Sequence, residues 1–178
     1  MLGSMDITIR PARVDELDEV GELTAQAYLG DGLLAFGEAD GYLAELRDAR
    51  RRAEHSEVLV AAERAGPGVR PLVLGAVAFV GDGGQYADIA GPGEGEFRML
   101  AVRPEGRGRG AGEALVRECL ARARALGLHR VVLSSQPQMA AAHRLYERLG
   151  FRRTPERDWQ PIPDLTLWTF TVDLPPSG

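Results

Sequence analysis

The stretch Glu96-Phe-Arg-Met-Leu-Ala-Val-Arg-Pro-Glu-Gly-Arg-Gly-Arg-Gly-Ala-Gly112 decides how this chain is expected to fold. From Phe97 to Val102 it is an apolar run broken only by Arg98, which predicts a strand. Pro104 cannot donate to a sheet ladder, so the strand should end near that residue. A glycine-rich basic segment follows, and a helix with one apolar stripe begins directly after it. The sequence therefore predicts a strand, a tight basic turn and a helix in direct succession.

Such a turn has the properties of a phosphate-binding loop. Glycine allows the backbone to approach a ligand and to turn its N–H groups toward it. The start of the following helix directs unpaired N–H groups and a positive dipole end to the same place. Arg107 and Arg109 add charge-assisted donors. The alternative interpretation is a surface turn whose arginines are only solvated.

Two nucleotide-binding motifs fit this turn poorly. A dinucleotide fingerprint can be half-fitted as Gly106-x-Gly108-x-x-Ala111, but it requires an acidic residue about 20 residues later, at the end of the next strand. That strand, predicted over residues 130–134, ends in Ser134-Ser135. A P-loop requires Gly-Lys-Ser or Gly-Lys-Thr, which the turn lacks. A nucleotide-dependent enzyme is therefore disfavoured.

A third pattern fits better. Arg107-x-x-Gly110-x-Gly112 resembles the Gln/Arg-x-x-Gly-x-Gly/Ala pyrophosphate loop of the GCN5-related N-acetyltransferase (GNAT) family. The segment 142–151, Ala-His-Arg-Leu-Tyr-Glu-Arg-Leu-Gly-Phe, is similar to that family's later Ala-x-x-Leu-Tyr-x-x-x-Gly-Phe segment. The resemblance covers about Glu94 to Arg152. It implies an α/β (α+β) fold with a mixed, mostly antiparallel sheet, helices on both faces, and a central strand pair, about 96–102 and 130–134, that splays apart.

The resemblance also implies an activity. It indicates an acetyl-CoA-dependent N-acetyltransferase that moves an acetyl group directly to a primary amine of a small molecule or a protein. Acetyl-CoA would be the co-substrate, and no metal is expected. The alternative is a non-catalytic acyl-CoA-binding or regulatory module on the same fold.

Two side chains are candidates for the chemistry. Tyr146 is the candidate acid, because a phenol with a pKa near 10 can protonate a departing thiolate with a pKa near 8.5, and the family often uses the tyrosine at this position. Glu96 is the candidate base, since it starts the strand that ends in the loop and the family often places a glutamate on this strand. Glu94 is a second candidate, and a solvated carboxylate without a catalytic role is the alternative for both.

The cofactor is expected to contact three parts of the chain. These are backbone groups of the central strand, the glycine-rich loop and the end of the next strand: Leu100, Ala101, Val102, Arg107, Gly108, Arg109, Gly110, Ala111, Gly112 and Ser135. Many family members carry an asparagine where this chain has Met139. Ser134, Ser135 or Gln138 is a candidate to replace that polar contact, and the alternative is that no residue replaces it.

Composition limits the remaining possibilities. The 178 residues predict one acetyltransferase domain over residues 5–174, and residues 1–4 resemble a cloning remnant before a native Met5. A net charge of −5 argues against a nucleic-acid partner. The single cysteine, the lack of a signal peptide and the lack of an apolar run long enough to span a membrane indicate a cytoplasmic protein that is not bound to a membrane. His55, His129 and His143 are scattered and predict no metal site. A homodimer remains an open alternative.

The remaining periodicity predicts the element order β-α-α-β-β-β-α-β-α-β-β. One helix is expected over about 40–53, and another with Pro137 in its first turn and Tyr146 on its inner stripe. Residues 81–95 are predicted to form a long loop. Tyr86 and Asp88 in this loop are expected either to face a substrate or to lie at a solvated tip.

Overall fold

The structure is a computed structural model that describes residues 6–81 and 86–176. The prediction about residues 1–4 lies outside the described residues. The strands and helices follow one another along the chain in this order: β1 Ile7–Pro11, α2 Leu17–Gly30, α3 Tyr42–Arg47, α4 Ala49–His55, β2 Glu57–Glu63, β3 Val73–Val80, β4 Glu94–Val102, α5 Ala111–Ala125, β5 Arg130–Ser135, α6 Ala140–Arg148, β6 Arg152–Arg153, β7 Trp159–Ile162 and β8 Leu165–Asp173.

The strands form the mixed sheet that the sequence analysis predicted. Hydrogen-bonded neighbours follow the order β1-β2-β3-β4-β5-β8-β6, and β7 pairs with β8. The pairs β1–β2, β2–β3 and β5–β8 are antiparallel, whereas β4–β5 is parallel. The described β4–β5 pairing joins only Glu94–Glu96 to Arg130–Val132. Both strands continue beyond this short ladder, and such a short parallel ladder is what a splayed central pair predicts.

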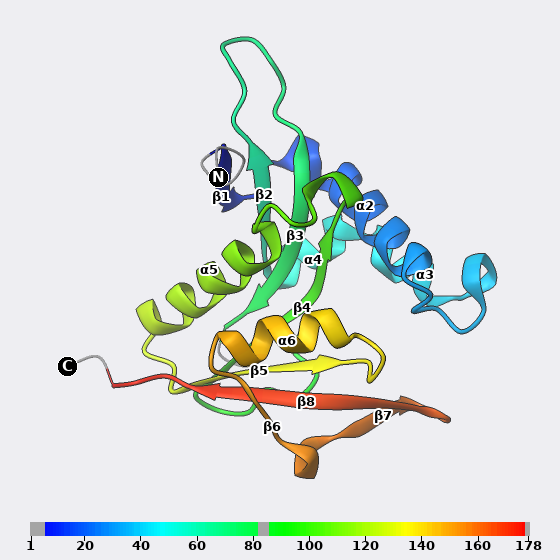
Figure 1. Cartoon of the computed structure of the whole chain (residues 1–178), viewed down its shortest axis with the longest axis vertical. Helices are drawn as coiled ribbons and strands as arrows, with labels where there is room; N and C mark the ends of the chain where they lie inside the picture. Colours follow the sequence, from blue (N-terminus) through cyan, green and yellow to red (C-terminus); the bar gives the residue numbers. More distant parts are fainter. Residues whose placement is uncertain (1–5, 82–85, 177–178) are drawn as a thin grey trace. The chain divides into compact units, whose positions relative to one another are not determined.

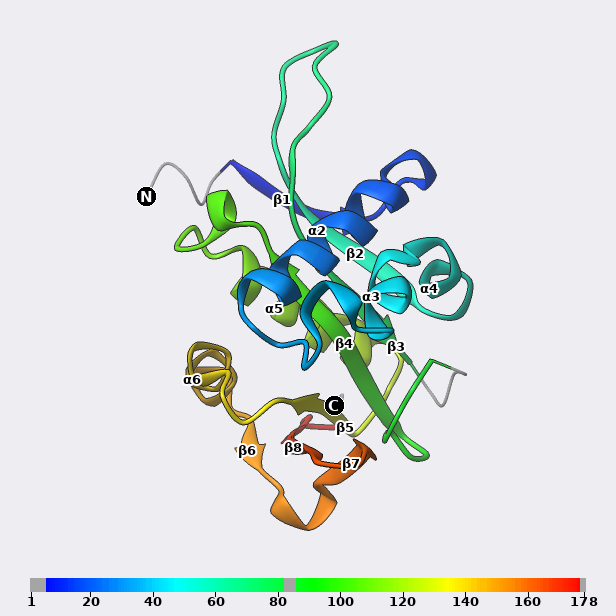
Figure 2. The ribbon, with the colours of Figure 1, turned by 90° about the vertical axis from the view of Figure 1, so that its right-hand side faces the viewer.

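Two compact units make up the chain, one formed by Met1–Phe79 with Met99–Glu118 and the other by Val80–Arg98 with Cys119–Gly178. In the first unit, α2 lies against the strands (Figure 2). It packs on them through Leu17, Val20 and Leu23. These side chains join a buried cluster with Val60 and Val73, so the apolar stripe of α2 covers β2 and β3. A prediction of one domain over residues 5–174 stays a prediction.

In the second unit, β8 is the strand to which β5, β6 and β7 all pair (Figure 1). The helix α6 packs against it through aromatic contacts. The rings of His143 and Tyr146 lie 4.9 and 5.8 Å from the ring of Phe170 on β8. The core of this unit is therefore an aromatic layer between α6 and β8.

Three local features differ from the sequence predictions. The helix expected over about 40–53 is interrupted at Asp48, whose side chain accepts a hydrogen bond from the N–H of Arg51 and caps α4. The helix expected to include Pro137 begins only at Ala140. The strand β7 was not predicted, because two prolines in Trp159–Asp164 obscure the strand pattern.

Candidate active site

The glycine-rich loop has the backbone geometry that close approach of a ligand requires. Gly108 and Gly110 have φ angles of 77° and 83°, a region that residues with side chains rarely adopt. A Cβ atom built at either glycine would meet no atom within 4 Å, so the space beside the backbone is open. The α5 helix begins at Ala111, and the first N–H groups of a helix have no partner within it. The two glycines with positive φ and the first residue of α5 therefore lie within the four residues 108–111.

Both arginines of the loop have acidic partners in the first unit. Arg107 donates two hydrogen bonds to the Asp31 carboxylate, at 3.2 and 3.1 Å, and Arg109 pairs with Glu63. The Arg107 side chain is 48 % exposed. It lines a cavity of about 350 Å³ between the end of α2 and the loop, together with Asp31, Arg103 and Glu105. Because the pair with Asp31 is open to solvent, an anionic ligand can compete with Asp31 for this guanidinium at low cost.

The last residues of β4 present backbone groups to two different edges. The N–H of Arg103 donates to the Leu74 carbonyl on the β3 side, at 2.7 Å. Successive residues of a strand direct their backbone groups to opposite edges, so Ala101 shares the β3 side while Leu100 and Val102 face the other edge. The carbonyl of Val102 accepts from Arg107 Nε at 3.3 Å, in agreement with this assignment. Of the three predicted backbone contacts, Leu100 and Val102 are on the edge away from β3.

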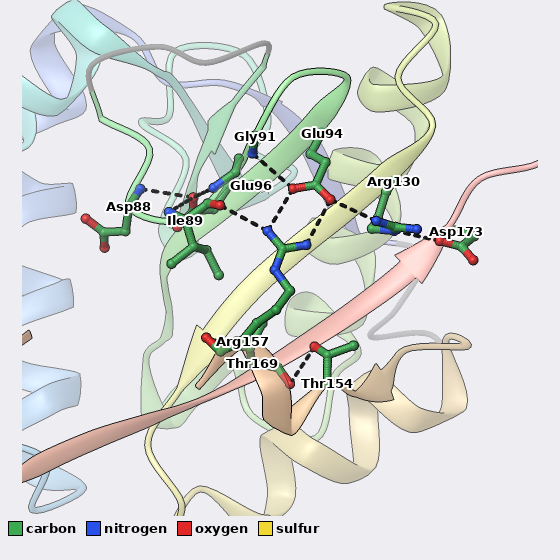
Figure 3. Close-up of polar contacts among 11 residues, drawn as sticks. Asp88, Ile89, Gly91, Glu94, Glu96, Arg130, Thr154, Arg157, Thr169 and Asp173 are labelled. Carbon is green, nitrogen blue, oxygen red and sulfur yellow. Dashed lines mark hydrogen bonds and ion pairs between the residues drawn. The ribbon is translucent and has the colours of Figure 1, made fainter. Parts of the chain in front are cut away.

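Glu96, in the second unit, is completely buried and holds a loop in place (Figure 3). Its Oε1 accepts three backbone hydrogen bonds, from Asp88, Ile89 and Ala90, at 2.9–3.0 Å. Its Oε2 has no hydrogen-bond partner among the described residues. Burial raises the pKa of the Glu96 carboxyl, against the lowering effect of the N–H groups. One oxygen is therefore a structural acceptor, and the other is buried without a hydrogen-bond partner among the described residues.

Glu94 has a different environment from Glu96. Arg157 donates to both of its oxygens at 2.8 and 2.9 Å, and Arg130 and the N–H of Gly91 complete the shell (Figure 3). These partners lower the pKa of Glu94 from 4.5 to about 2, and the hydrogen bonds from Arg157 make the largest contribution. A carboxylate with such a low pKa is a weak base, which argues against Glu94 in that role.

Tyr146 lies in the aromatic layer of the second unit. It is 4 % exposed, and its ring centroid lies 5.8–5.9 Å from those of Phe97, Phe151 and Phe170. Since Phe97 follows Glu96 directly in β4, the structure brings the candidate acid and the strand of the candidate base together. This packing holds the Tyr146 ring, and with it the phenolic hydroxyl, in one orientation.

The polar residues around Met139 are engaged in different ways. Ser134 accepts a hydrogen bond from Trp159 Nε1 at 2.9 Å, and Gln138 donates to the side chain of Gln136. The hydroxyl of Ser135 lies 3.0 Å from His143 Nε2, and it also contacts Met139 Sδ at 3.6 Å. Sequence reasoning missed His143. Its spacing of three residues from Tyr146 on one helix face was the signal that could have identified it.

The loop that carries Tyr86 and Asp88 is bound to β4 at a second point. The Arg98 side chain donates to the carbonyl of Tyr86, lies 4.5 Å from the centre of its ring, and pairs with the Asp88 carboxylate at 3.0 Å. Both residues are thus attached to the strand, and Asp88 keeps 32 % of its side chain exposed. Residues 82–85 of this loop lie outside the described residues.

Comparison with known proteins shows the family. A model of the Acetyltransferase (GNAT) family matches residues 19–151, and the chain belongs to this family of acyltransferases. An uncharacterized N-acetyltransferase of Schizosaccharomyces pombe is 38 % identical over 77 residues, which are 43 % of this chain and 47 % of that protein. A mycothiol acetyltransferase of Thermobispora bispora is 48 % identical over 59 residues, 33 % of this chain and 20 % of that protein. The chain thus matches less than half the length of these relatives.

The fold is also that of solved acetyltransferases. A GNAT superfamily phosphinothricin acetyltransferase from Sinorhizobium meliloti, solved in complex with acetyl-CoA, superposes with a TM-score of 0.69. The two chains are 21 % identical, and the match covers 96 % of this chain and 89 % of the other. In the part of the chain that the structure describes, no helix is long and apolar enough to cross a membrane. The same residues contain no group of three or more His, Cys, Asp and Glu that could hold a metal ion.

Proposed function

We propose that this protein transfers an acetyl group directly from acetyl-CoA to a primary amine of a small molecule or a protein. The observation that carries the proposal is the loop of Arg107 to Gly112. Two glycines with positive φ, open space beside them and a helix start make it a receptor for the diphosphate of acetyl-CoA. Backbone groups of Leu100, Ala101 and Val102, and the hydroxyl of Ser135, complete the proposed contacts.

Glu96 and Tyr146 are the proposed base and acid. Glu96 accepts the amine proton at its unpartnered Oε2 through a water molecule, because this atom is buried. The amine nitrogen then bonds to the acetyl carbon while the carbon–sulfur bond breaks, and Tyr146 gives its phenolic proton to the departing thiolate. The new amide nitrogen gives its excess proton to the tyrosinate, which restores the phenol, and Glu96 releases its proton to water. The raised pKa of Glu96 supports its part, because a base with a pKa closer to neutrality accepts a proton more readily.

Direct transfer is supported by the position of Cys119. It is the single cysteine in the sequence, and it is completely buried in α5. A buried thiol in apolar surroundings is not a reactive nucleophile, so an acetyl-cysteine intermediate is not expected. We further propose a cytoplasmic location. The protein is either a monomer or a homodimer, and size-exclusion chromatography with light scattering distinguishes the two.

Binding is tested by calorimetric titration with acetyl-CoA, and with NADH and ATP as comparison ligands. Gly110→Asp should abolish acetyl-CoA binding, because it adds a side chain and a negative charge where the diphosphate is proposed to lie. Gly68→Asp is the matched control: Gly68 also has a positive φ, of 75°, and open space around it, but it lies in the turn between β2 and β3. Equal acetyl-CoA affinities of the two variants would contradict the loop assignment.

Turnover separates the enzyme from a non-catalytic acyl-CoA-binding module. Thiol release on addition of an amine library supports transfer, whereas binding without any thiol release indicates the module. All 21 basic Lys and Arg residues of the sequence are arginines. Because the chain has no lysine, an acetyl-lysine signal in an assay with protein acceptors comes from the acceptor and not from the enzyme.

A further inference from the structure

Ser135 and His143 form a buried hydrogen-bonded pair in the second unit. Ser135 ends β5 and His143 lies in the first turn of α6, with Oγ and Nε2 3.0 Å apart. Their exposed fractions are only 5 % and 8 %. Buried polar groups need partners, so the direction of this hydrogen bond determines whether the hydroxyl can act as a donor or as an acceptor toward a ligand.

The backbone fixes the proton position on the His143 ring. The ring also hydrogen-bonds the backbone of Gln136, an interaction that favours the protonated ring and thus identifies the ring nitrogen as the donor. Since Nε2 faces Ser135, the donor to Gln136 is Nδ1. A neutral imidazole with its proton on Nδ1 can only accept at Nε2. The Ser135 hydroxyl therefore directs its one hydrogen to His143 Nε2, at 3.0 Å, in preference to Met139 Sδ, which lies 3.6 Å away and is a weak acceptor. The serine oxygen keeps lone pairs for a second donor.

The surroundings of His143 keep the ring neutral at physiological pH. Burial lowers the pKa of His143, and so does the positive charge of Arg153 on β6. Glu147, one helical turn along α6, acts in the opposite direction. From β8 the rings of Trp168 and Phe170, which carry no charge, lie 5.5 and 4.9 Å from the His143 ring. Ser135 of β5 is likewise uncharged.

The end of β5 is placed to use this hydroxyl. One edge of the strand pairs with β8, where Ser135 lies opposite Trp168. On the other edge, the described pairing with β4 ends at Val132, three residues before Ser135. Beyond Val132, no further pairing of this edge with β4 is described.

We propose that His143 is a positioning residue that holds the Ser135 hydroxyl as an acceptor for an amide N–H of the acyl-CoA arm. This inference rests on the proposed function, because that function supplies the ligand. The arm contains secondary amides, whose N–H groups require such an acceptor. When His143 is protonated, Nε2 becomes a donor to Ser135, and the hydroxyl then presents its hydrogen to the ligand N–H. Two donors then face each other, and the hydrogen bond between Ser135 and the ligand is lost.

The test is the pH dependence of acetyl-CoA affinity, measured by calorimetry between about pH 5 and 8. The wild-type affinity should fall as the pH drops through the pKa of His143, by roughly 2- to 12-fold, the value of one ordinary hydrogen bond. His143→Gln can still accept from Ser135 but does not titrate, so its affinity should lack this step. Ser135→Ala should bind more weakly by a similar factor at neutral pH, again without the step. Ionisation of the ligand's own phosphates affects all three proteins equally.

Three outcomes overturn the inference. The first is an unchanged step in His143→Gln, and the second is wild-type affinity in Ser135→Ala. The third is a wild-type protein that binds acetyl-CoA with no step, which refutes the role of His143 but not the proposed function. A wild-type protein that fails to bind acetyl-CoA at every pH refutes both. Near-ultraviolet circular dichroism of the tryptophans verifies that each variant keeps the packing of Trp168.

Discussion

Replacing Glu94 by glutamine is expected to destabilise the protein at neutral pH by about 3 kcal/mol. The Glu94 side chain is only 7 % exposed, and Arg157 and Arg130 surround it. Its pKa is about 2 in the folded state against a usual value of 4.5, and one pH unit corresponds to about 1.36 kcal/mol. Glutamine keeps the shape and one acceptor oxygen, but its NH2 group replaces the other acceptor and faces arginine donors, so the substitution removes the charge and one side of the two-oxygen pair with Arg157.

The pH dependence of this effect has a defined sign. The folded-state pKa is depressed, so the stabilisation is complete above the unfolded-state value near 4.5 and disappears as the pH falls toward 2. Urea unfolding followed by circular dichroism at pH 7, 5, 4 and 3 measures the free energy of unfolding of both proteins. The difference between wild type and Glu94→Gln should be largest at pH 7 and should shrink below pH 4.5. At pH 7 the melting temperature should fall by roughly 6–12 °C.

Asp173→Asn is the matched control. Asp173 pairs with the same Arg130, at 2.7 Å, but its side chain is 57 % exposed. Solvent screens such a pair, so this variant should unfold close to the wild-type midpoint. The reasoning is refuted if Glu94→Gln is within about 0.5 kcal/mol of wild type at pH 7, or if the difference between the two proteins does not change with pH.

Three further substitutions test other parts of the structure. Gly21→Ala would place a Cβ atom 2.0 Å from the carbonyl oxygen of Arg47, so α2 and α3 must separate. We expect the free energy of unfolding, measured in urea, to fall by about 1–3 kcal/mol. Gly30→Ala is the control, because Gly30 has open space around it in the same helix, and its free energy of unfolding should not fall. Tyr146→Phe keeps the aromatic packing and should lower kcat by roughly 10²- to 10⁴-fold with unchanged acetyl-CoA affinity, and near-normal turnover would remove Tyr146 from the acid role. Glu96→Gln retains an acceptor for the loop amides but cannot take a proton, so it should lower kcat and abolish the acidic limb of the pH–rate profile; a profile identical to wild type would exclude Glu96 as the base.

The parts of the fold that could be predicted are those written in local sequence. The loop after β4 was predictable because glycine, arginine and a following helix start are adjacent in the chain. Tyr146 was found because its motif lies within ten residues. The mixed sheet and its splayed central pair came from the resemblance to the GNAT family, and the strand pairing confirms both.

Contacts between distant residues were not predictable in the same way. Nothing near Glu94 in the sequence indicates that Arg157, 63 residues later, takes both of its oxygens. The distinction between Glu94 and Glu96, which the strand alternation left open, depends on that arginine. The pairing of Ser135 with His143 likewise depends on how α6 packs on β8. Asp48 interrupts a helix that periodicity extends through it, because a side-chain cap competes with continued helix at that residue.

The attachment of the loop to Glu96 has a consequence for how acceptor preference can evolve or be engineered. Three consecutive main-chain N–H groups, from residues 88, 89 and 90, converge on one carboxylate oxygen. Main-chain groups are the same for every residue except proline, so this anchor does not depend on which side chains occupy those positions. Residues 89 and 90 can therefore be randomised, proline excepted, while the backbone keeps its course, and Asp88 is kept because its carboxylate pairs with Arg98. A library at these two positions would explore new acceptors on a loop that Glu96 and Arg98 hold in place.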